Sequence, residues 1–113
     1  MRWVADAEAV AWLATRPALE WDDANTRKLT KHPLTRGEIA AVFAGVPYLL
    51  GRIVEPAHSE PRWVALGRTV TGRRVTVIFT RRAARLRPIS SRAMRRNERR
   101  LYEERRSQEG GPT

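Results

Sequence analysis

The chain has 113 residues, which is enough for one domain with a small hydrophobic core. With no Cys and two His, it excludes a disulfide scaffold, a thiolate zinc site and a cysteine nucleophile, and it disfavours a multi-histidine metal site. Lys and Arg number 22 against 12 acidic residues, and this surplus is typical of proteins that bind a polyanion, most often nucleic acid.

Helical patterns dominate the first part of the chain. Residues 3–14 carry apolar side chains at helical spacing, which predicts an amphipathic helix that ends before Pro17. Residues 19–21 are interpreted as a short strand. Residues 22–31 are expected to form a second helix, capped by one of its two leading aspartates. A third helix is predicted between Thr35 and Gly45, with Thr35 and a glutamate three residues later forming a capping box.

The middle of the chain changes to the period of strands. Residues 48–54, 63–70 and 74–80 have strand-like patterns, and a Thr-Gly turn signal joins the second to the third. Residues 86–89 offer a fourth strand, in which Pro88 indicates an edge or a bulge. Four sequential strands with short links predict an antiparallel meander.

A basic helix is predicted to follow the strands, capped by Ser90 or Ser91. The expected fold class is therefore α+β, with N-terminal helices, a twisted antiparallel four-stranded meander and a basic C-terminal helix. We expect residues 1–17 to be an extra N-terminal helix, residues 18–106 the main domain and residues 107–113 a disordered tail.

The positive charge is concentrated in the second half of the chain. Residues 1–60 hold 7 basic and 8 acidic side chains, whereas residues 61–113 hold 15 and 4. Between Arg81 and Arg106 all eleven cations are Arg. Arg binds phosphate in bidentate geometry and stacks on bases, which favours RNA or DNA as the partner. A solvated helix face and a docking surface for an acidic protein are the alternatives.

The predicted second helix carries the side chains best suited to catalysis. Asn25, Lys28 and His32 lie at i, i+3 and i+7, and Lys31 is next to His32. RNA cleavage without a metal needs a base for the 2′-hydroxyl, an acid for the leaving 5′-oxygen, and cations near the phosphorus. Because His titrates near neutral pH, it can serve as either acid or base. A merely solvated helix is the alternative.

Other candidates lie on the strands and the last helix. His58 falls in a loop, and Arg62 and Arg81 could hold one phosphate if they share a face of the sheet. Glu98 is a candidate acid or base, but the simpler interpretation is an intrahelical partner of neighbouring arginines. The predicted last helix places further arginines on or near one face: Arg92, Arg95, Arg96 and Arg99.

Four short motifs in order resemble the BrnT family of bacterial toxins, the RelE-like ribonucleases of type II toxin–antitoxin systems. They span residues 19–104. The motifs are Glu20-Trp21-Asp22-x-x-Asn25-x-x-Lys28-x-x-Lys31-His32, then Ala40-x-x-Phe43, then His58-Ser59 with Arg62-Trp63 and Gly67, and finally Ile89-Ser90-x-Arg92 with Glu98-Arg99-Arg100-x-Tyr102-Glu103.

The resemblance implies a RelE-like sheet with helices packed on it and an RNA-cleaving toxin that blocks translation. The residues that it carries over by position as catalytic or RNA-contacting are Lys28, Lys31, His32, His58, Arg62, Arg81, Arg92 and Tyr102. Of these, we assign His58 to RNA binding, together with Arg95, Arg96 and Arg99, and the others to catalysis.

The resemblance also implies a cognate antitoxin, usually a ribbon-helix-helix protein, and contact with operator DNA only through the toxin–antitoxin complex. We expect a bacterial cytoplasmic protein with no membrane span, because no apolar run is long enough to cross a bilayer and no signal-peptide pattern opens the chain. We also expect it to need no metal and no cofactor. The alternative is a non-catalytic RelE-like module that binds nucleic acid or an antitoxin.

Overall fold

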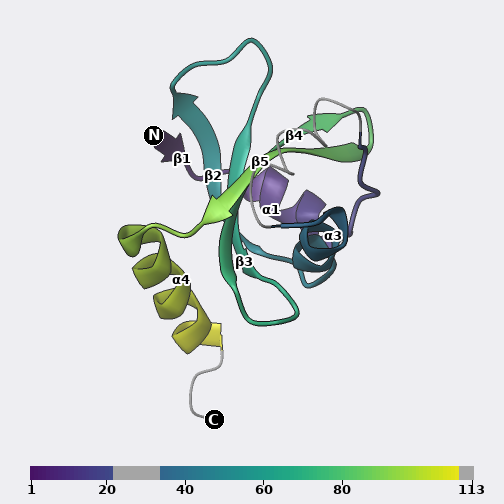
Figure 1. The fold of residues 1–113 in the computed structure, drawn as a ribbon. Helices are drawn as coiled ribbons and strands as arrows, with labels where there is room; N and C mark the ends of the chain where they lie inside the picture. Colours follow the sequence, from purple (N-terminus) through teal and green to yellow (C-terminus); the bar gives the residue numbers. More distant parts are fainter. Residues whose placement is uncertain (22–33, 110–113) are drawn as a thin grey trace.

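The computed structural model describes residues 1–21 and 34–109, except for the side chain of residue 109. The fold is α+β, with α1, α3 and α4 and five strands in the described part (Figure 1). The strands are β1 (Arg2–Val4), β2 (Tyr48–Glu55), β3 (Trp63–Arg68), β4 (Arg74–Arg82) and β5 (Arg85–Ala93), and the helices are α1 (Ala7–Ala14), α3 (Arg36–Ala44) and α4 (Arg96–Glu109). The helix predicted over residues 22–31 lies outside the described residues.

The sheet has five strands in the order β1-β2-β3-β4-β5, so the prediction of four strands was wrong. The extra strand is β1, which pairs antiparallel with β2, with Arg2 opposite Glu55 and Trp3 opposite Ile53. The helix predicted over residues 3–14 therefore starts later than expected, at α1. Asp6 caps α1 by accepting a hydrogen bond from the backbone N–H of Ala9 at 3.1 Å.

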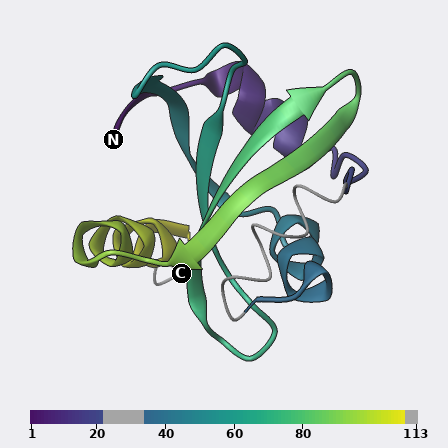
Figure 2. The same cartoon turned by 45° about the horizontal axis from the view of Figure 1, so that its top comes forward.

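Helices cover both faces of the sheet. Helices α1 and α3 lie on one face and α4 lies on the other (Figures 1 and 2). A first core fills the space under α1 and α3, and Phe79 of β4 is at its centre. The ring of Phe79 meets Phe43 edge-on at 5.4 Å and stacks on Trp63 at 5.8 Å. A second, smaller core beneath α4 includes Leu66 and Tyr102.

Local signals set the ends of several elements. The capping box predicted for the third helix is confirmed: Thr35 accepts from the N–H of Glu38, and the Glu38 carboxylate accepts from the N–H of Thr35. Pro88 lies on the last strand where the β4–β5 register shifts, which confirms the predicted edge or bulge. Residues 19–21 form a single parallel bridge, between Leu19 and Leu86, instead of a strand.

The start of the last helix differs from the prediction. Ser90 and Ser91 belong to β5, so neither caps α4. Ser91 is buried opposite Val77, where it is part of the sheet instead of a helix end. The carboxylate of Glu98 accepts from the backbone N–H of Arg95, just before α4, at 2.8 Å. This bond satisfies the N–H of Arg95, which would otherwise need another acceptor, such as a capping side chain, at the start of the helix.

None of the helices formed by residues 1–21 and 34–109 is long and apolar enough to cross a membrane.

Candidate functional site

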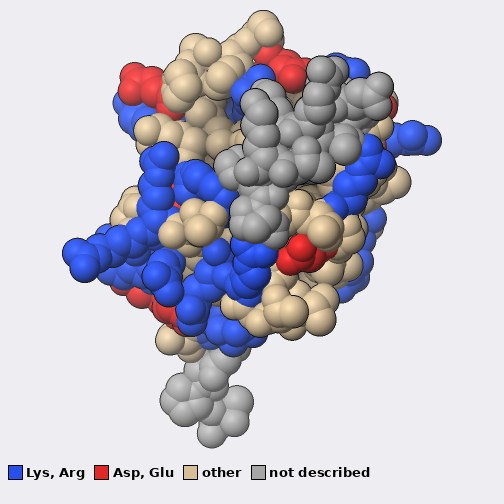
Figure 3. Space-filling view, viewed as in Figure 1, with Lys and Arg blue, Asp and Glu red and all other residues tan. Residues whose placement is uncertain are grey.

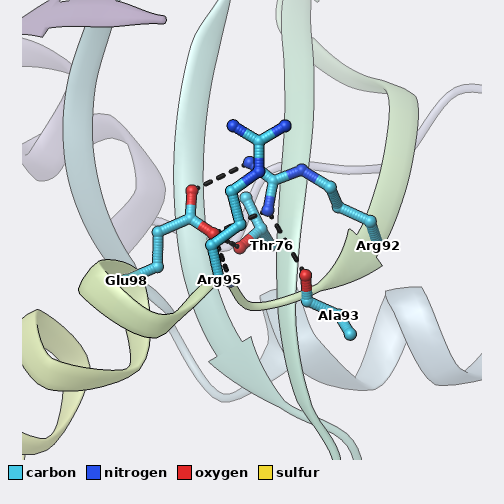
Figure 4. Close-up of polar contacts among 5 residues, drawn as sticks. All are labelled: Thr76, Arg92, Ala93, Arg95 and Glu98. Carbon is cyan, nitrogen blue, oxygen red and sulfur yellow. Dashed lines mark hydrogen bonds and ion pairs between the residues drawn. The ribbon is translucent and has the colours of Figure 1, made fainter.

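A buried carboxylate connects α4 to the sheet. Glu98, with 4% of its surface exposed, receives two hydrogen bonds from Arg92, from Nη1 at 2.6 Å and from Nη2 at 2.8 Å (Figure 4). The hydroxyl of Thr76 on β4 donates a third at 2.9 Å, and the N–H of Arg95 donates a fourth. Glu98 therefore holds β4, β5 and the start of α4 together.

The environment of Glu98 keeps it ionised. Burial by itself raises its pKa, but the hydrogen bonds from Arg92, the Arg95 N–H and Thr76 outweigh that effect and lower the pKa to about 2. Glu98 is thus a carboxylate at neutral pH and has no proton to donate there. Its partner is Arg92 on β5, where the sequence had predicted Arg95 or other arginines of the same helix.

Arg92 belongs to β5 and not to the last helix, which corrects its predicted place. Its guanidinium forms the bidentate pair with Glu98, and Nη1 also donates to the carbonyl of Ala93 at 3.3 Å. A quarter of the Arg92 side chain remains exposed. Arg92 therefore presents part of its charge at the surface while most of its donors are engaged.

Exposed arginines surround this network. Arg95, Arg96 and Arg99 are exposed, and within the described part of the chain none of the three forms an ion pair. Lys and Arg side chains gather over α4 and the adjoining sheet (Figure 3). Tyr102, one turn beyond Glu98, is buried in the second core. Through Glu98 the structure thus brings Arg92 to the start of α4, where these arginines lie, whereas Tyr102 packs in the core beneath the helix.

Arg62 and Arg81 do not share a face of the sheet, so they cannot hold one phosphate as a pair. The guanidinium of Arg81 lies 4.6 Å from the ring of Trp12 in α1, on the first-core face. Arg62 precedes Trp63, which packs in the first core, so alternation places Arg62 on the α4 face. The Nε of Arg62 is buried and has no hydrogen-bond partner among residues 1–21 and 34–109.

The remaining candidates are not part of this cluster. His58 is exposed in the loop between β2 and β3, at the end of β3 away from α4. Lys28, Lys31 and His32 lie outside the described residues. Within residues 1–21 and 34–109, no three His, Asp or Glu side chains gather as metal ligands.

Thr76 and Trp12 contact candidate residues and were missed from the sequence. Thr76 carries a weak signal, because it alternates with core residues on a strand and a buried hydroxyl needs a partner. Trp12 lies within the range predicted as an amphipathic helix, and no contact with the candidate site was predicted for it. Its contact with Arg81 joins α1 to the end of β4, and no sequence pattern around either residue predicts this contact.

Comparison with known families decides between these interpretations. The family model described as the ribonuclease toxin BrnT of type II toxin-antitoxin systems matches residues 21–98. The chain belongs to this family. The resemblance drawn from the motifs is thereby confirmed, and the chain is a ribonuclease toxin with an RNA target and a cognate antitoxin. Searches of the curated proteins and of the solved structures gave no match.

The matched range covers most of the candidate residues. It includes Lys28, Lys31, His32, His58, Arg62, Arg81 and Arg92 and ends at Glu98. Tyr102 and most of α4 follow its end, and β1 and α1 precede its start. The family match and the Glu98 network therefore overlap at Arg92 and Glu98.

Proposed function

We propose that the protein is a metal-independent endoribonuclease that cleaves RNA in the bacterial cytoplasm and inhibits translation until its antitoxin binds. The match to a ribonuclease toxin family over residues 21–98 carries this proposal. The exposed arginines of α4 support it, because RNA affinity depends mainly on contacts with phosphates. The RelE-like character of the sheet is part of the same proposal.

The proposed reaction is attack of a 2′-hydroxyl on the adjacent phosphorus. A base removes the proton of the 2′-hydroxyl, the 2′-oxygen bonds to phosphorus, and the 5′-oxygen leaves with a proton from an acid. The products are a 2′,3′-cyclic phosphate and a 5′-hydroxyl. Lys28, Lys31 and His32 are the groups we propose for proton transfer and charge stabilisation. The metal-independent part of the proposal rests on these side chains, which carry out the steps without a metal.

On the described surface we propose that RNA lies on the α4 face of the sheet. Arg62 and Arg92 are both on this face, and Arg92 lies across β4 from Leu66 through Thr76. Arg62 and Leu66 are four residues apart, or about 13 Å along an extended strand. We propose that Arg62, Arg92 and Tyr102 contact the strand near the cut and that Arg95, Arg96, Arg99 and His58 hold flanking phosphates. Arg81, on the other face, is proposed as a separate contact.

The antitoxin is proposed to be a ribbon-helix-helix protein, and the operator is proposed to be bound only by the complex. The basic surface over α4 supports docking of an acidic segment, since opposite charges steer association. An antitoxin that masks this surface would block RNA as well.

Expression in bacteria tests the proposal. Induction of the wild-type chain is expected to stop growth and incorporation of labelled amino acids, and co-expression of the neighbouring antitoxin gene is expected to restore both. The double variant Lys31→Ala/His32→Ala should accumulate without stopping growth. Growth arrest by this variant equal to that of wild type would reject the proposed catalytic groups, and continued translation with wild type would reject the toxin activity.

A further inference from the structure

A pocket of about 490 Å³ opens at the end of the sheet away from His58 and Arg62. Its walls come from α1, the last turn of α3 and the segment that follows it, the start of β2, the end of β3 and the second half of α4. Figure 1 shows α4 and α3 on either side of the β3–β4 turn, which follows Arg68 and Thr69 of the pocket wall. The volume falls within the range of roughly 300–1,000 Å³ that small-molecule sites occupy.

The polar side chains of the pocket combine flat rings with positive charge. Tyr48 and Tyr102 line it, together with Arg68, Arg105 and Arg106, and no carboxylate lines it within the part of the chain that the structure describes. Arg106 also lies 3.9 Å from the carboxylate of Glu103. The guanidinium of Arg105 lies 5.3 Å from the ring of Tyr48, and that of Arg106 lies 5.9 Å from the ring of Tyr102. The pocket therefore suits a ligand that has both a planar ring and a negative charge.

The apolar wall of the pocket is closely packed. Gly67 of β3 lies against α3, and a Cβ at this position would come within 2.6 Å of Val42 Cγ1 and 3.3 Å of Pro47 Cβ. Leu49 and Val42 of the same wall are buried. Such packing favours a preformed shape over one that has to be built around a ligand.

We infer that this pocket binds one nucleotide of the RNA strand, with its base against the Tyr48–Arg105 pair and its phosphate at Arg68 and Arg106. Unpaired bases of RNA are recognised by stacking on aromatic rings and guanidinium planes, and phosphates by Arg. This inference rests on the proposed function for the identity of the strand.

The pocket shares Tyr102 with the contacts proposed near the cut but lies away from Arg62. Arg62 and Arg68 lie at opposite ends of β3, six residues apart, which is about 20 Å at the rise of an extended strand. Helix α4, which carries exposed arginines, also contributes to the pocket wall. The pocket therefore holds a nucleotide about 20 Å from Arg62 and extends the length of RNA that the protein recognises.

Binding of uncleavable RNA tests the inference. Fluorescence anisotropy would measure the Kd of a labelled ten-nucleotide 2′-O-methyl RNA, which has no free 2′-hydroxyl to attack. Tyr48→Leu is expected to raise this Kd about fivefold or more, the effect of losing one stacked base. Arg68→Gln is expected to raise it and to reduce the slope of log K against log salt by about 1.

Arg2→Gln is the matched control, since it removes one exposed Arg that pairs with Glu55 far from the pocket. We expect its Kd to stay within about twofold of wild type. Equal Kd values for Arg2→Gln, Arg68→Gln and Tyr48→Leu would overturn the inference. If thermal denaturation shows that Tyr48→Leu does not fold, the Kd of Arg68→Gln alone tests the inference. Arg68 is exposed, so its replacement should leave the fold intact.

Two further readouts separate the possible outcomes. Calorimetry would measure the binding of uridine 5′-monophosphate to wild type and to Tyr48→Leu. If the mononucleotide binds wild type as tightly as the oligonucleotide does, and Tyr48→Leu abolishes this binding, the ligand is a free nucleotide and the assignment to an RNA strand is overturned. Tyr48-dependent binding without any cleavage of unmodified RNA would reject the ribonuclease proposal alone. Cleavage by wild type with unchanged Kd in both pocket variants would reject the nucleotide pocket alone.

Discussion

The carboxylate of Glu98 should stabilise the fold in a way that depends on pH. Its pKa falls from an ordinary 4.5 to about 2 in the folded chain, because the hydrogen bonds from Arg92, Arg95 and Thr76 outweigh the effect of burial. A carboxyl whose folded pKa is depressed favours the folded state once it is ionised. This stabilisation is therefore fully present above about pH 5 and is lost as pH falls from about 4.5 to about 2. At neutral pH it amounts to about 3 kcal/mol.

Replacing Glu98 by Gln removes the charge and keeps the size of the side chain. We expect Glu98→Gln to lower the free energy of unfolding by about 3 kcal/mol at pH 7 and by about half that at pH 3. At pH 3 the carboxyl of the unfolded wild-type chain is mostly protonated, so folding has to ionise it and the carboxylate contributes less. Urea denaturation followed by tryptophan fluorescence would measure both values.

Glu104→Gln is the matched control on the same helix. Glu104 is 56% exposed and lies 3.6 Å from Arg100, so its loss should cost less than about 1 kcal/mol at either pH. The account of Glu98 would be refuted by a loss that is the same at pH 7 and pH 3. A loss at pH 7 no larger than that of Glu104→Gln would refute it as well.

Two further substitutions test the packing that supports the site. Asp6→Ala should cost about 2 kcal/mol of unfolding free energy, because it removes the cap of α1 and the bond that Trp63 Nε1 donates at 2.9 Å. A loss below about 0.5 kcal/mol in urea denaturation, the size expected of a neutral surface substitution, would contradict this expectation. Gly67→Ala should cost about 1–3 kcal/mol through its clash with Val42. The double variant with Val42→Ala should be less destabilised than the sum of the single variants, and strict additivity would argue against the clash.

Local signals predicted the elements whose stability is local. The capping box of Thr35 and Glu38 acts within four residues, so the start of α3 could be identified from its own sequence. The turn before β4 and the bulge at Pro88 were predictable for the same reason.

The prediction failed where distant segments compete with local propensity. Trp3 and Val4 fit a helical pattern, yet they form β1 because β2 offers a partner strand about fifty residues away. Ser90 and Ser91 are good caps by composition, but Ser91 is buried in the sheet and the Glu98 carboxylate serves the start of α4. Long-range pairing of this kind leaves no local trace in a single sequence.

The candidate site shows the same division. Residue types and their order were sufficient to indicate an RNA-cleaving toxin family, which the match over residues 21–98 confirms. Placement was harder to predict. The face on which Arg62 lies depends on the register of β3, and the engagement of Arg92 depends on where α4 begins.

The chemistry of the RNA ends tests the central proposal most directly. Purified wild-type protein would be incubated with single-stranded RNA in excess EDTA, and the products would be analysed by mass spectrometry. We expect fragments with 2′,3′-cyclic phosphates and 5′-hydroxyls, and we expect none from Lys31→Ala/His32→Ala or from 2′-O-methyl RNA. Intact RNA in EDTA, or fragments with 5′-phosphates, would contradict a metal-independent reaction that uses the 2′-hydroxyl.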